Sequence, residues 1–310
     1  MGKLPLVIIS SPTATGKTQL AVNLSLKFGG EIISADSLQV YRYLDIGTAK
    51  PSMEQRRGVR HHLIDVVDPD EEFNASVFAQ RARGIISDLA GKGTPVFIAG
   101  GTGLYLRALL HGIIDTPDVD ENIRNYYRRL RDIHGKKYIY DLLLKRDADA
   151  ASRINQNDSV RVIRALEVLD QTGESILVKQ KKHLFADSPY KTYKIGLELD
   201  RKELKKRIIQ RTDKMIADGL LNEVKSILDR GYPENLKPMQ SLGYKQMIGF
   251  LRHEYSWESS IDLIKRDTWH YAKRQMTWFA ADKEINRFDC NSPDEIIKNV
   301  EIFLKENGII

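Results

Sequence analysis

The feature that most constrains this chain is a strand–loop–helix signal near its beginning. A β-branched run at 6–10 leads into the loop 11–18, and a helical pattern with Leu20, Leu24 and Phe28 at every fourth position follows. This is the context of a P-loop, where backbone N–H groups and a helix N-terminus together form an anion site. We therefore expect a diphosphate or triphosphate to be bound by Ser11, Pro12, Thr13, Ala14, Thr15, Gly16, Lys17 and Thr18.

The loop also indicates a metal ion. Lys17 supplies a mobile positive charge, and the Thr18 hydroxyl can hold Mg²⁺, which is the one cofactor we expect. Ser11 stands where the usual pattern has glycine, so the backbone is less free at that position. The motif does not identify its ligand, because a prenyl diphosphate and a nucleotide present the same phosphates to it.

The rest of the chain predicts an α/β core with a helical insertion. Extended runs at 31–35, 61–67 and 95–99 alternate with helical segments, one of them capped by Asn74, which is typical of a mostly parallel sheet covered on both faces. From about 118 to 190 the signals are helical and basic, and then a strand-like run at 191–199 and helices at 202–230 and 256–281 follow. We expect a P-loop core in two parts, 1–117 and 193–310, interrupted by an inserted α-helical domain at 118–192.

Composition excludes several classes of protein. The 310 residues are 42% hydrophobic with a mean hydropathy of −0.39, which rules out disorder, and the single cysteine, Cys290, rules out a disulfide scaffold and favours the cytoplasm. No apolar run approaches the ~20 residues that span a bilayer, so we expect no membrane association. The net charge of +6 is uneven, with +4 at 121–190 and +5 at 201–282 against −1 at 1–120. A polyanion docked on the basic segments would explain this distribution, as would solvated helix faces.

Three further motifs lie on or directly after expected strands. Asp36 follows the run at 31–35, and there it can be a Mg²⁺ partner, a general base or a helix cap. The segment 100–103, Gly-Gly-Thr-Gly, stands where an ATPase usually carries an acidic residue, which disfavours a motor or GTPase. His61 and His62 are neighbours on a strand and point to opposite faces, so we interpret them as strand residues rather than metal ligands.

Basic side chains share helix faces in the two positively charged segments. Arg161 with Arg164, and Arg207 with Arg211, are spaced to clamp phosphates, although a solvated face is the alternative for each pair. The helix around 269–279 mixes cations with aromatic residues. We expect its aromatic residues to lie in the core, and we expect contacts with a nucleic-acid backbone from Lys273, Arg274 and Gln275.

Taken together, these motifs resemble the bacterial tRNA dimethylallyltransferases (tRNA isopentenyltransferases). The resemblance covers the P-loop and Ser-Ala-Asp-Ser-Leu-Gln-Val-Tyr at 34–41, Asp-Ile-Gly-Thr-Ala-Lys-Pro at 45–51, His-His-Leu-Ile-Asp at 61–65, Gly-Gly-Thr-Gly-Leu-Tyr at 100–105, Arg-Ala-Leu-Glu-Val at 164–168, Gly-Tyr-Lys-Gln at 243–246 and Ala-Lys-Arg-Gln at 272–275. It implies a P-loop-kinase-like core whose helical insertion grips the anticodon stem-loop. The implied reaction moves a dimethylallyl group from dimethylallyl diphosphate to N6 of the adenine just 3′ of the anticodon, in tRNAs that read codons beginning with U.

The resemblance also implies residue roles. Asp36 matches the general base, Thr102 matches a position close to both substrates, and Lys17, Arg207 and Arg211 would stabilise the diphosphate leaving group. The partners are then a tRNA anticodon stem-loop and dimethylallyl diphosphate, and we expect a monomer. Stretches that match tRNA-contacting positions are Asp36, Ser37, Leu38, Gln39, Thr102, Arg124, Val160, Arg161, Val162, Ile163, Arg164, Gln240, Ser241, Leu242, Gly243, Tyr244 and Lys245.

Two other classes of function fit part of the sequence. A P-loop nucleoside or small-molecule kinase would use Asp36 to orient an acceptor hydroxyl and Arg207 and Arg211 as lid residues. That interpretation leaves the basic insertion without a role. A non-catalytic RNA-binding protein gated by a nucleotide would leave Asp36 and Thr102 unexplained.

Overall fold

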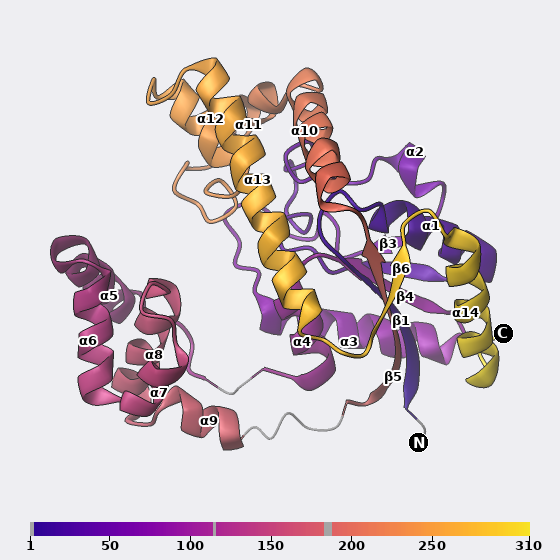
Figure 1. The fold of residues 1–310 in the computed structure, drawn as a ribbon, viewed down its shortest axis with the longest axis horizontal. Helices are drawn as coiled ribbons and strands as arrows, with labels where there is room; N and C mark the ends of the chain where they lie inside the picture. The colour runs from indigo at the N-terminus through magenta and orange to yellow at the C-terminus, as the bar shows by residue number, and fades with distance from the viewer. Residues whose placement is uncertain (1–2, 114–115, 183–187) are drawn as a thin grey trace. The chain divides into compact units, whose positions relative to one another are not determined.

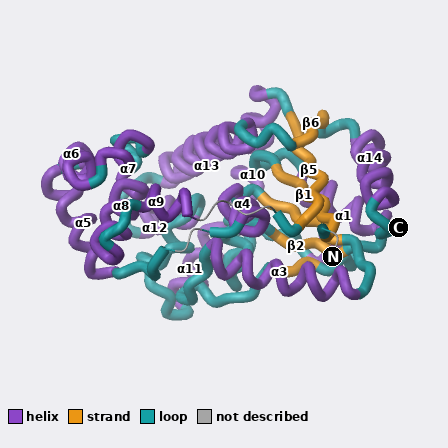
Figure 2. The backbone as a smooth tube through the Cα atoms, turned by 90° about the horizontal axis from the view of Figure 1, so that it is seen from below, coloured by secondary structure: helices purple, strands orange, loops and turns teal. Residues whose placement is uncertain are grey.

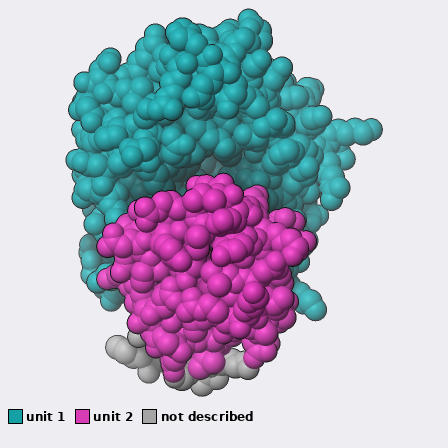
Figure 3. All heavy atoms as spheres, turned by 90° about the vertical axis from the view of Figure 1, so that its left-hand side faces the viewer, with its two compact units in different colours: residues 1–110, 188–310 teal, residues 111–187 magenta. Residues whose placement is uncertain are grey.

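The chain folds into two compact units. The computed structural model describes residues 3–113, 116–182 and 188–310, and the chain divides into one unit of residues 1–110 and 188–310 and a second unit of residues 111–187 (Figures 1 and 3). The predicted insertion at 118–192 ends too late, because Tyr190, Lys191 and Thr192 already pair with the first strand. Among the described residues, no helix combines the length and the apolar character needed to cross a membrane.

The first unit is built on a parallel sheet. Its strands in the described residues are β1 (Leu4–Ser10), β2 (Glu31–Ser34), β3 (His61–His62), β4 (Val96–Gly100), β5 (Tyr190–Glu198) and β6 (Ile285–Asp289). They lie in the order β3-β2-β4-β1-β5-β6, and every neighbouring pair is parallel. This confirms the predicted α/β class with a mostly parallel sheet. The strand β1 lies inside the sheet, between β4 and β5.

Helices cover both faces of the sheet (Figure 2). Alternate residues of a strand point to opposite faces, and in β1 the residues on both faces are apolar and buried. Val7 and Ile9 of β1 pack with α1 (Lys17–Phe28) and α14 (Pro293–Glu306). Leu6 and Ile8, one position out of step, pack in the larger core with α3 (Ala75–Gly91) and α4 (Gly103–His111). The remaining helices of this unit are α2 (Met53–Arg56), α10 (Arg201–Ala217), α11 (Leu220–Asp229), α12 (Tyr244–Leu251) and α13 (Trp257–Ala280).

Two predicted elements differ from the structure. The extended run at 61–67 forms a strand only at His61–His62, because Leu63 and Asp65 have left-handed φ values of 60° and 56° that turn the chain away from the sheet. The single helix predicted over 202–230 is two helices, α10 and α11, since Gly219 between them has a φ of 98°.

The second unit is helical, as the sequence indicates. It contains α5 (Glu121–His134), α6 (Lys136–Arg146), α7 (Ala148–Arg153), α8 (Ser159–Thr172) and α9 (Ile176–Lys182) around an apolar core that includes Tyr127 and Leu166. Asp158 caps α8 by accepting a hydrogen bond from the Arg161 N–H at 3.2 Å. The carboxylate of Glu167 is fully buried in this unit.

Candidate active site

Three of the predicted motifs meet at the carboxyl edge of the sheet. The P-loop follows β1, Asp36 follows β2 and the glycine-rich turn follows β4, which lies between β1 and β2. The Ala35 N–H donates to the Ala99 carbonyl at 2.8 Å, and the Thr102 N–H donates to the Ala35 carbonyl at 3.2 Å. Adjacent parallel strands therefore bring the predicted catalytic residues Lys17, Asp36 and Thr102 to one edge.

The P-loop is shaped by its own hydroxyl groups. Thr15 Oγ1 donates to the Pro12 carbonyl at 2.9 Å and lies 2.9 Å from Ser11 Oγ. The left-handed positions are Ala14, with a φ of 65°, and Gly16, with a φ of 95°. Ser11 is outside that region, so the loop does not require glycine at this position, and the serine hydroxyl gains a partner inside the loop.

Two positively charged side chains, Lys17 and Arg211, contact the P-loop. Lys17 Nζ donates to the Pro12 carbonyl at 2.6 Å, and Arg211 Nη1 donates to Thr13 Oγ1 at 3.0 Å. Burial and the neighbouring Arg211 lower the pKa of Lys17 to about 7, and the charge of Asp36 opposes this shift. Burial also lowers the pKa of Arg211, against the charge of Asp36. An arriving phosphate anion would favour the charged form of both groups, so the site is built for an anion.

Asp36 has a capping role as well as an open position. Its Oδ1 accepts hydrogen bonds from the Leu38 N–H at 2.9 Å and the Gln39 N–H at 3.3 Å. It therefore caps a turn, and not the helix considered from sequence, because the next helix along the chain is α2. Thr102 Oγ1 accepts from the Ser37 N–H at 3.1 Å and so lies beside the same turn. Because Oδ1 takes both capping bonds, Oδ2 is the oxygen suited to take a proton. One pocket is lined by Thr13, Lys17, Thr18, Asp36, Arg211, Tyr271 and Gln275, among others.

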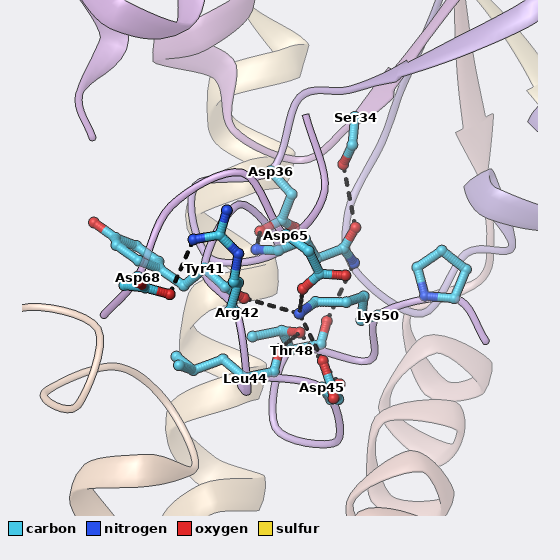
Figure 4. Close-up of polar contacts among 12 residues, drawn as sticks. Ser34, Asp36, Tyr41, Arg42, Leu44, Asp45, Thr48, Lys50, Asp65 and Asp68 are labelled. Atoms are coloured by element: carbon cyan, nitrogen blue, oxygen red, sulfur yellow. Dashed lines mark hydrogen bonds and ion pairs between the residues drawn. The ribbon is translucent and has the colours of Figure 1, made fainter. Parts of the chain in front are cut away.

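The loop at 37–51, which follows Asp36, is held by a buried lysine (Figure 4). Lys50 Nζ donates to the Tyr41 carbonyl at 2.8 Å, to Asp45 Oδ1 at 2.6 Å and to Asp65 Oδ1 at 2.5 Å. Gln39 Nε2 donates to the carbonyls of Thr48 and Ala49, at 3.3 Å each, and so joins the far end of the loop to the Asp36 turn. These contacts fix the backbone on which Asp36 is presented.

The carboxylate of Glu223, on α11, supports the same loop. Glu223 accepts hydrogen bonds from three successive backbone N–H groups at 45–47 and from the Tyr244 hydroxyl at 2.6 Å. Gly47 leaves room for the Tyr244 ring, which a methyl group at that position would overlap. The Tyr244 side chain is fully buried, so it is not presented to a tRNA in this structure. Its role in this structure is to shape the loop.

Gln275 is the clearest correction at the residue level. We expected it on the nucleic-acid surface, but it is only 5% exposed and lies inside the site. Its Oε1 accepts from the Thr13 N–H at 2.9 Å, and its Nε2 donates to the Gly101 carbonyl at 2.9 Å. Tyr271 lies one turn earlier on α13 and lines the same pocket, and burial together with the charge of Asp36 raises its pKa above the usual range. Sequence spacing puts both residues on one helix face but does not show that this face meets the P-loop.

The two predicted phosphate-clamping arginines separate. Arg211 lies on the P-loop, whereas Arg207 Nε donates to Glu203 Oε1 at 3.1 Å and its Nη1 lies 4.0 Å from Cys290 Sγ. Arg207 is not among the residues that line the pocket with Asp36. Of the pair, Arg211 is the one that contacts the P-loop, through Thr13.

The tRNA-contact candidates divide by exposure. Val160, Arg161, Gln240, Lys245, Lys273 and Arg274 are exposed, and Ser37, Leu38, Ser241 and Leu242 are half-buried. Lys273 lines a second cavity, on the Ser11–Pro12 side of the P-loop, and the Arg274 guanidinium lies over the Tyr271 ring at 5.8 Å. These exposed groups remain candidates for RNA contact.

Other candidates are committed to the structure. Val162 and Ile163 are buried in the core of the second unit, and Gly243 is buried with its N–H donating to Gln246 Oε1 at 2.9 Å. Arg124 and Arg164 both hold the buried Glu167, at 2.9 and 2.7 Å. A buried carboxylate needs such partners, so these two arginines stabilise the unit whatever else they contact.

The fold and the site define a P-loop-kinase-like transferase, with a P-loop, a carboxylate in the same pocket and a separate helical unit. The chain belongs to the IPP transferase family, whose model matches residues 39–282. A relative from Syntrophus aciditrophicus named tRNA dimethylallyltransferase 2 is 50% identical over 300 residues, which cover 97% of this chain and 96% of the relative. These similarities match the transferase prediction rather than the kinase alternative.

Solved structures of the same family agree with this assignment. A tRNA isopentenylpyrophosphate transferase from Bacillus halodurans is 38% identical, with a TM-score of 0.73 and coverage of 99% of this chain and 98% of that chain. A eukaryotic dimethylallyltransferase crystallised acting on tRNA is 26% identical, with a TM-score of 0.82 and coverage of 98% of this chain and 80% of that chain.

Proposed function

We propose that this chain transfers the dimethylallyl group of dimethylallyl diphosphate to N6 of the adenine immediately 3′ of the anticodon, in tRNAs that read codons beginning with U. The observation that carries the proposal is one pocket lined by Lys17 of the P-loop, by Arg211, which contacts that loop from α10, and by Asp36. That arrangement suits an anionic leaving group at one end and the loss of a proton at the other. We propose the cytoplasm as the location, because the substrate would be tRNA.

In the proposed step, one bond breaks, one bond forms and one proton is transferred, and these side chains act on the leaving group and the proton. The allylic C–O bond breaks and its electron pair leaves with the diphosphate, while the adenine nitrogen forms the new N–C bond. Negative charge grows on the leaving diphosphate, where the P-loop N–H groups, Lys17 and Arg211 would stabilise it. The proton from the exocyclic amine would pass to Asp36 Oδ2, which suits a poor nucleophile that needs a base. The adenine would leave its single-stranded stack to reach this pocket.

We also propose that Mg²⁺ belongs to this site. Thr18 is exposed at the pocket and offers a hydroxyl oxygen, and Asp36 lines the same pocket with carboxylate oxygens, which are the hard ligands Mg²⁺ prefers. The Thr18 hydroxyl would hold the ion together with phosphate oxygens. When bound, Mg²⁺ would neutralise charge on the diphosphate.

The kinase alternative is less well supported. The strand β4 ends at Gly100 and is followed by Gly101, Thr102 and Gly103, none of which is the acidic residue that an ordinary P-loop ATPase carries there. A kinase would also leave the basic second unit without a role. The two interpretations predict different labelled products.

The test is a transfer assay with two donors. The protein, Mg²⁺ and an unmodified anticodon stem-loop are incubated with dimethylallyl diphosphate labelled in the prenyl carbon. We expect label in the RNA, and none when the acceptor adenine is replaced by guanine. Label that stays out of the RNA, together with transfer of the terminal phosphate of ATP to a small acceptor, would replace this proposal with the kinase.

A further inference from the structure

One buried amide joins the two halves of the site. Gln275 receives the Thr13 N–H of the P-loop on its Oε1 and gives its Nε2–H to the Gly101 carbonyl, with both distances 2.9 Å. A backbone N–H can only donate and a carbonyl can only accept, so this orientation of the amide is the one that keeps both bonds. Reversing the amide would break both bonds, the part-buried one to the Thr13 N–H and the buried one to the Gly101 carbonyl.

Each end of this bridge leads to a different part of the site. Thr13 is also held by Arg211, whose Nη1 donates to Thr13 Oγ1 at 3.0 Å. The bond from Thr13 to Gln275 therefore holds the P-loop. Gly101 immediately precedes Thr102, which bonds the Asp36 turn through the Ala35 carbonyl and the Ser37 N–H. The Gln275 side chain is therefore a direct side-chain connection between the P-loop and the Asp36 turn, beyond the ends of the paired strands β1 and β4.

The residue at 101 is matched to this bridge. A Cβ built on Gly101 would overlap Gln275 Nε2, and the next nearest atom outside that amide group is the Ser11 carbonyl oxygen, at 3.9 Å. Gly101 does not have a left-handed φ, so the backbone there would accept alanine. The space that glycine leaves at this position is thus occupied by the amide of Gln275.

We propose that Gln275 is a positioning residue for group transfer, which sets the distance between the P-loop and the Thr102–Asp36 turn. This rests on the proposed function, in which the donor's diphosphate binds at the first and the acceptor adenine meets the second. Loss of the amide lets the two ends separate without removing a ligand of either substrate. A misplacement of about 1 Å costs roughly 100-fold in rate, so transfer suffers more than binding does.

The test is a double-mutant cycle of Gln275→Ala and Gly101→Ala, read on the single-turnover transfer rate with both substrates saturating. We expect each single variant to slow transfer by roughly 10- to 100-fold. The double variant should be no slower than Gln275→Ala alone, because removal of the amide frees the space that the added methyl group needs. Affinity for inorganic diphosphate with Mg²⁺, measured by calorimetry, should change by less than about threefold.

Ser260→Ala is the matched control. Ser260 is buried on the same helix, α13, and its hydroxyl donates to the Ser256 carbonyl at 2.9 Å, away from the pocket. We expect this variant to lower the melting temperature and leave the transfer rate unchanged. If Gln275→Ala melts below the assay temperature, Gln275→Met serves in its place for the transfer rate and the diphosphate affinity, since it keeps about the same side-chain volume, adds no charge and loses both hydrogen bonds.

Three results would overturn the proposal: an unchanged transfer rate in the Gln275 variants, a double variant slowed by the product of the two single effects, or diphosphate affinity that falls as far as the rate. A wild-type chain without transfer would instead refute the proposed function. The same cycle read on melting temperature would then decide the Gln275–Gly101 contact, with additive losses counting against it.

Discussion

At the residue scale, Asp36 combines a structural contact with its proposed role as the base. Oδ1 caps the turn by accepting from the N–H groups of Leu38 and Gln39, and Oδ2 would receive the proton. The capping bonds also hold the carboxylate in place, which a base needs if it is to meet one particular amine hydrogen. An isosteric substitution can therefore separate the two duties.

Asp36→Asn should lower kcat by at least ~100-fold, because the amide oxygen can keep the capping bonds but the group no longer acts as a base. Affinities for the stem-loop and for diphosphate should stay within a few-fold of the wild type. Steady-state kinetics and direct binding of each substrate check this. Near-normal turnover in Asp36→Asn would remove Asp36 from the role of base.

The residues that sequence reasoning placed well are those at strand ends. Asp36 and Thr102 follow β2 and β4, and the rule that parallel strands share a carboxyl edge brings them to the P-loop. Arg207 and Gln275 could not be placed in this way. Spacing shows which residues share a face of a helix, but the direction of that face depends on how α10 and α13 pack, which is a long-range property.

At the element scale, the loop at 37–51 depends on one lysine with three oxygen partners. The Lys50 side chain is 4% exposed, while its partners Asp45 and Asp65 are 61% and 41% exposed. Lys50→Met should lower the free energy of unfolding by about 1–3 kcal/mol, because the Tyr41 carbonyl and both carboxylates lose a charged donor. Urea unfolding of the two proteins measures the difference.

Lys214→Met is the control for Lys50. Lys214 pairs with Asp218 at 3.0 Å but is 73% exposed, and exposed pairs contribute little. We expect a change below about 0.5 kcal/mol in this variant. Equal losses in the two variants would mean that burial of Lys50 contributes nothing special to the loop.

Tyr127 gives the second unit a pH-dependent contact. Its hydroxyl donates to Asp170 Oδ2 at 2.6 Å and accepts from Arg146 Nη1 at 2.8 Å. Burial, and then the bond to Asp170, raise the pKa of Tyr127 to about 12 from its ordinary 10.0. A raised pKa stabilises the folded state fully below pH 10, and this contribution is lost as the pH rises from 10 to 12.

Tyr127→Phe should therefore cost more stability at pH 8 than at pH 11. At pH 8 we expect a loss of about 1–2 kcal/mol from the missing hydrogen bonds. Thermal unfolding by circular dichroism at both pH values measures the gap in melting temperature between the two proteins. A gap that is constant or widens between pH 8 and pH 11 would contradict this account of Tyr127.

Elements with clear local signals were predicted well. Asn74 caps α3, Ser256 caps α13, and Gly29 follows α1, so that these helices begin and end close to where the sequence indicates. β6 and α14 were missed, although Pro293 at the start of α14 is an ordinary signal for a helix N-terminus. β6 buries only Ile285 and Phe288 at the edge of the sheet, so its pattern lacks the alternation of a strand.

At the scale of the whole molecule, charge is the property through which both units would contact the proposed RNA partner. The two segments with excess positive charge include the exposed candidates Arg161 and Lys273. If both neutralise phosphates, Arg161→Gln and Lys273→Gln should each reduce the slope of log affinity against log salt by roughly one. Stem-loop binding at several salt concentrations measures this slope.

Lys305→Gln is the control for charge alone. Lys305 is exposed on α14, where it pairs with Glu301 at 2.6 Å, in a segment with excess negative charge. We expect no change in the salt slope for this variant. A loss of slope in Lys305→Gln equal to that in Arg161→Gln would mean that RNA responds to net charge and not to particular side chains.

The measurement that tests the central claim most directly is the chemical identity of the product. Full-length unmodified tRNA that reads a codon beginning with U is treated with the protein, Mg²⁺ and dimethylallyl diphosphate, then digested to nucleosides for mass spectrometry. We predict N6-dimethylallyladenosine from the adenine next to the anticodon with the wild-type chain, and a severe loss of it with Asp36→Asn. Unchanged adenosine with the wild type, or equal modification by both proteins, would contradict the account.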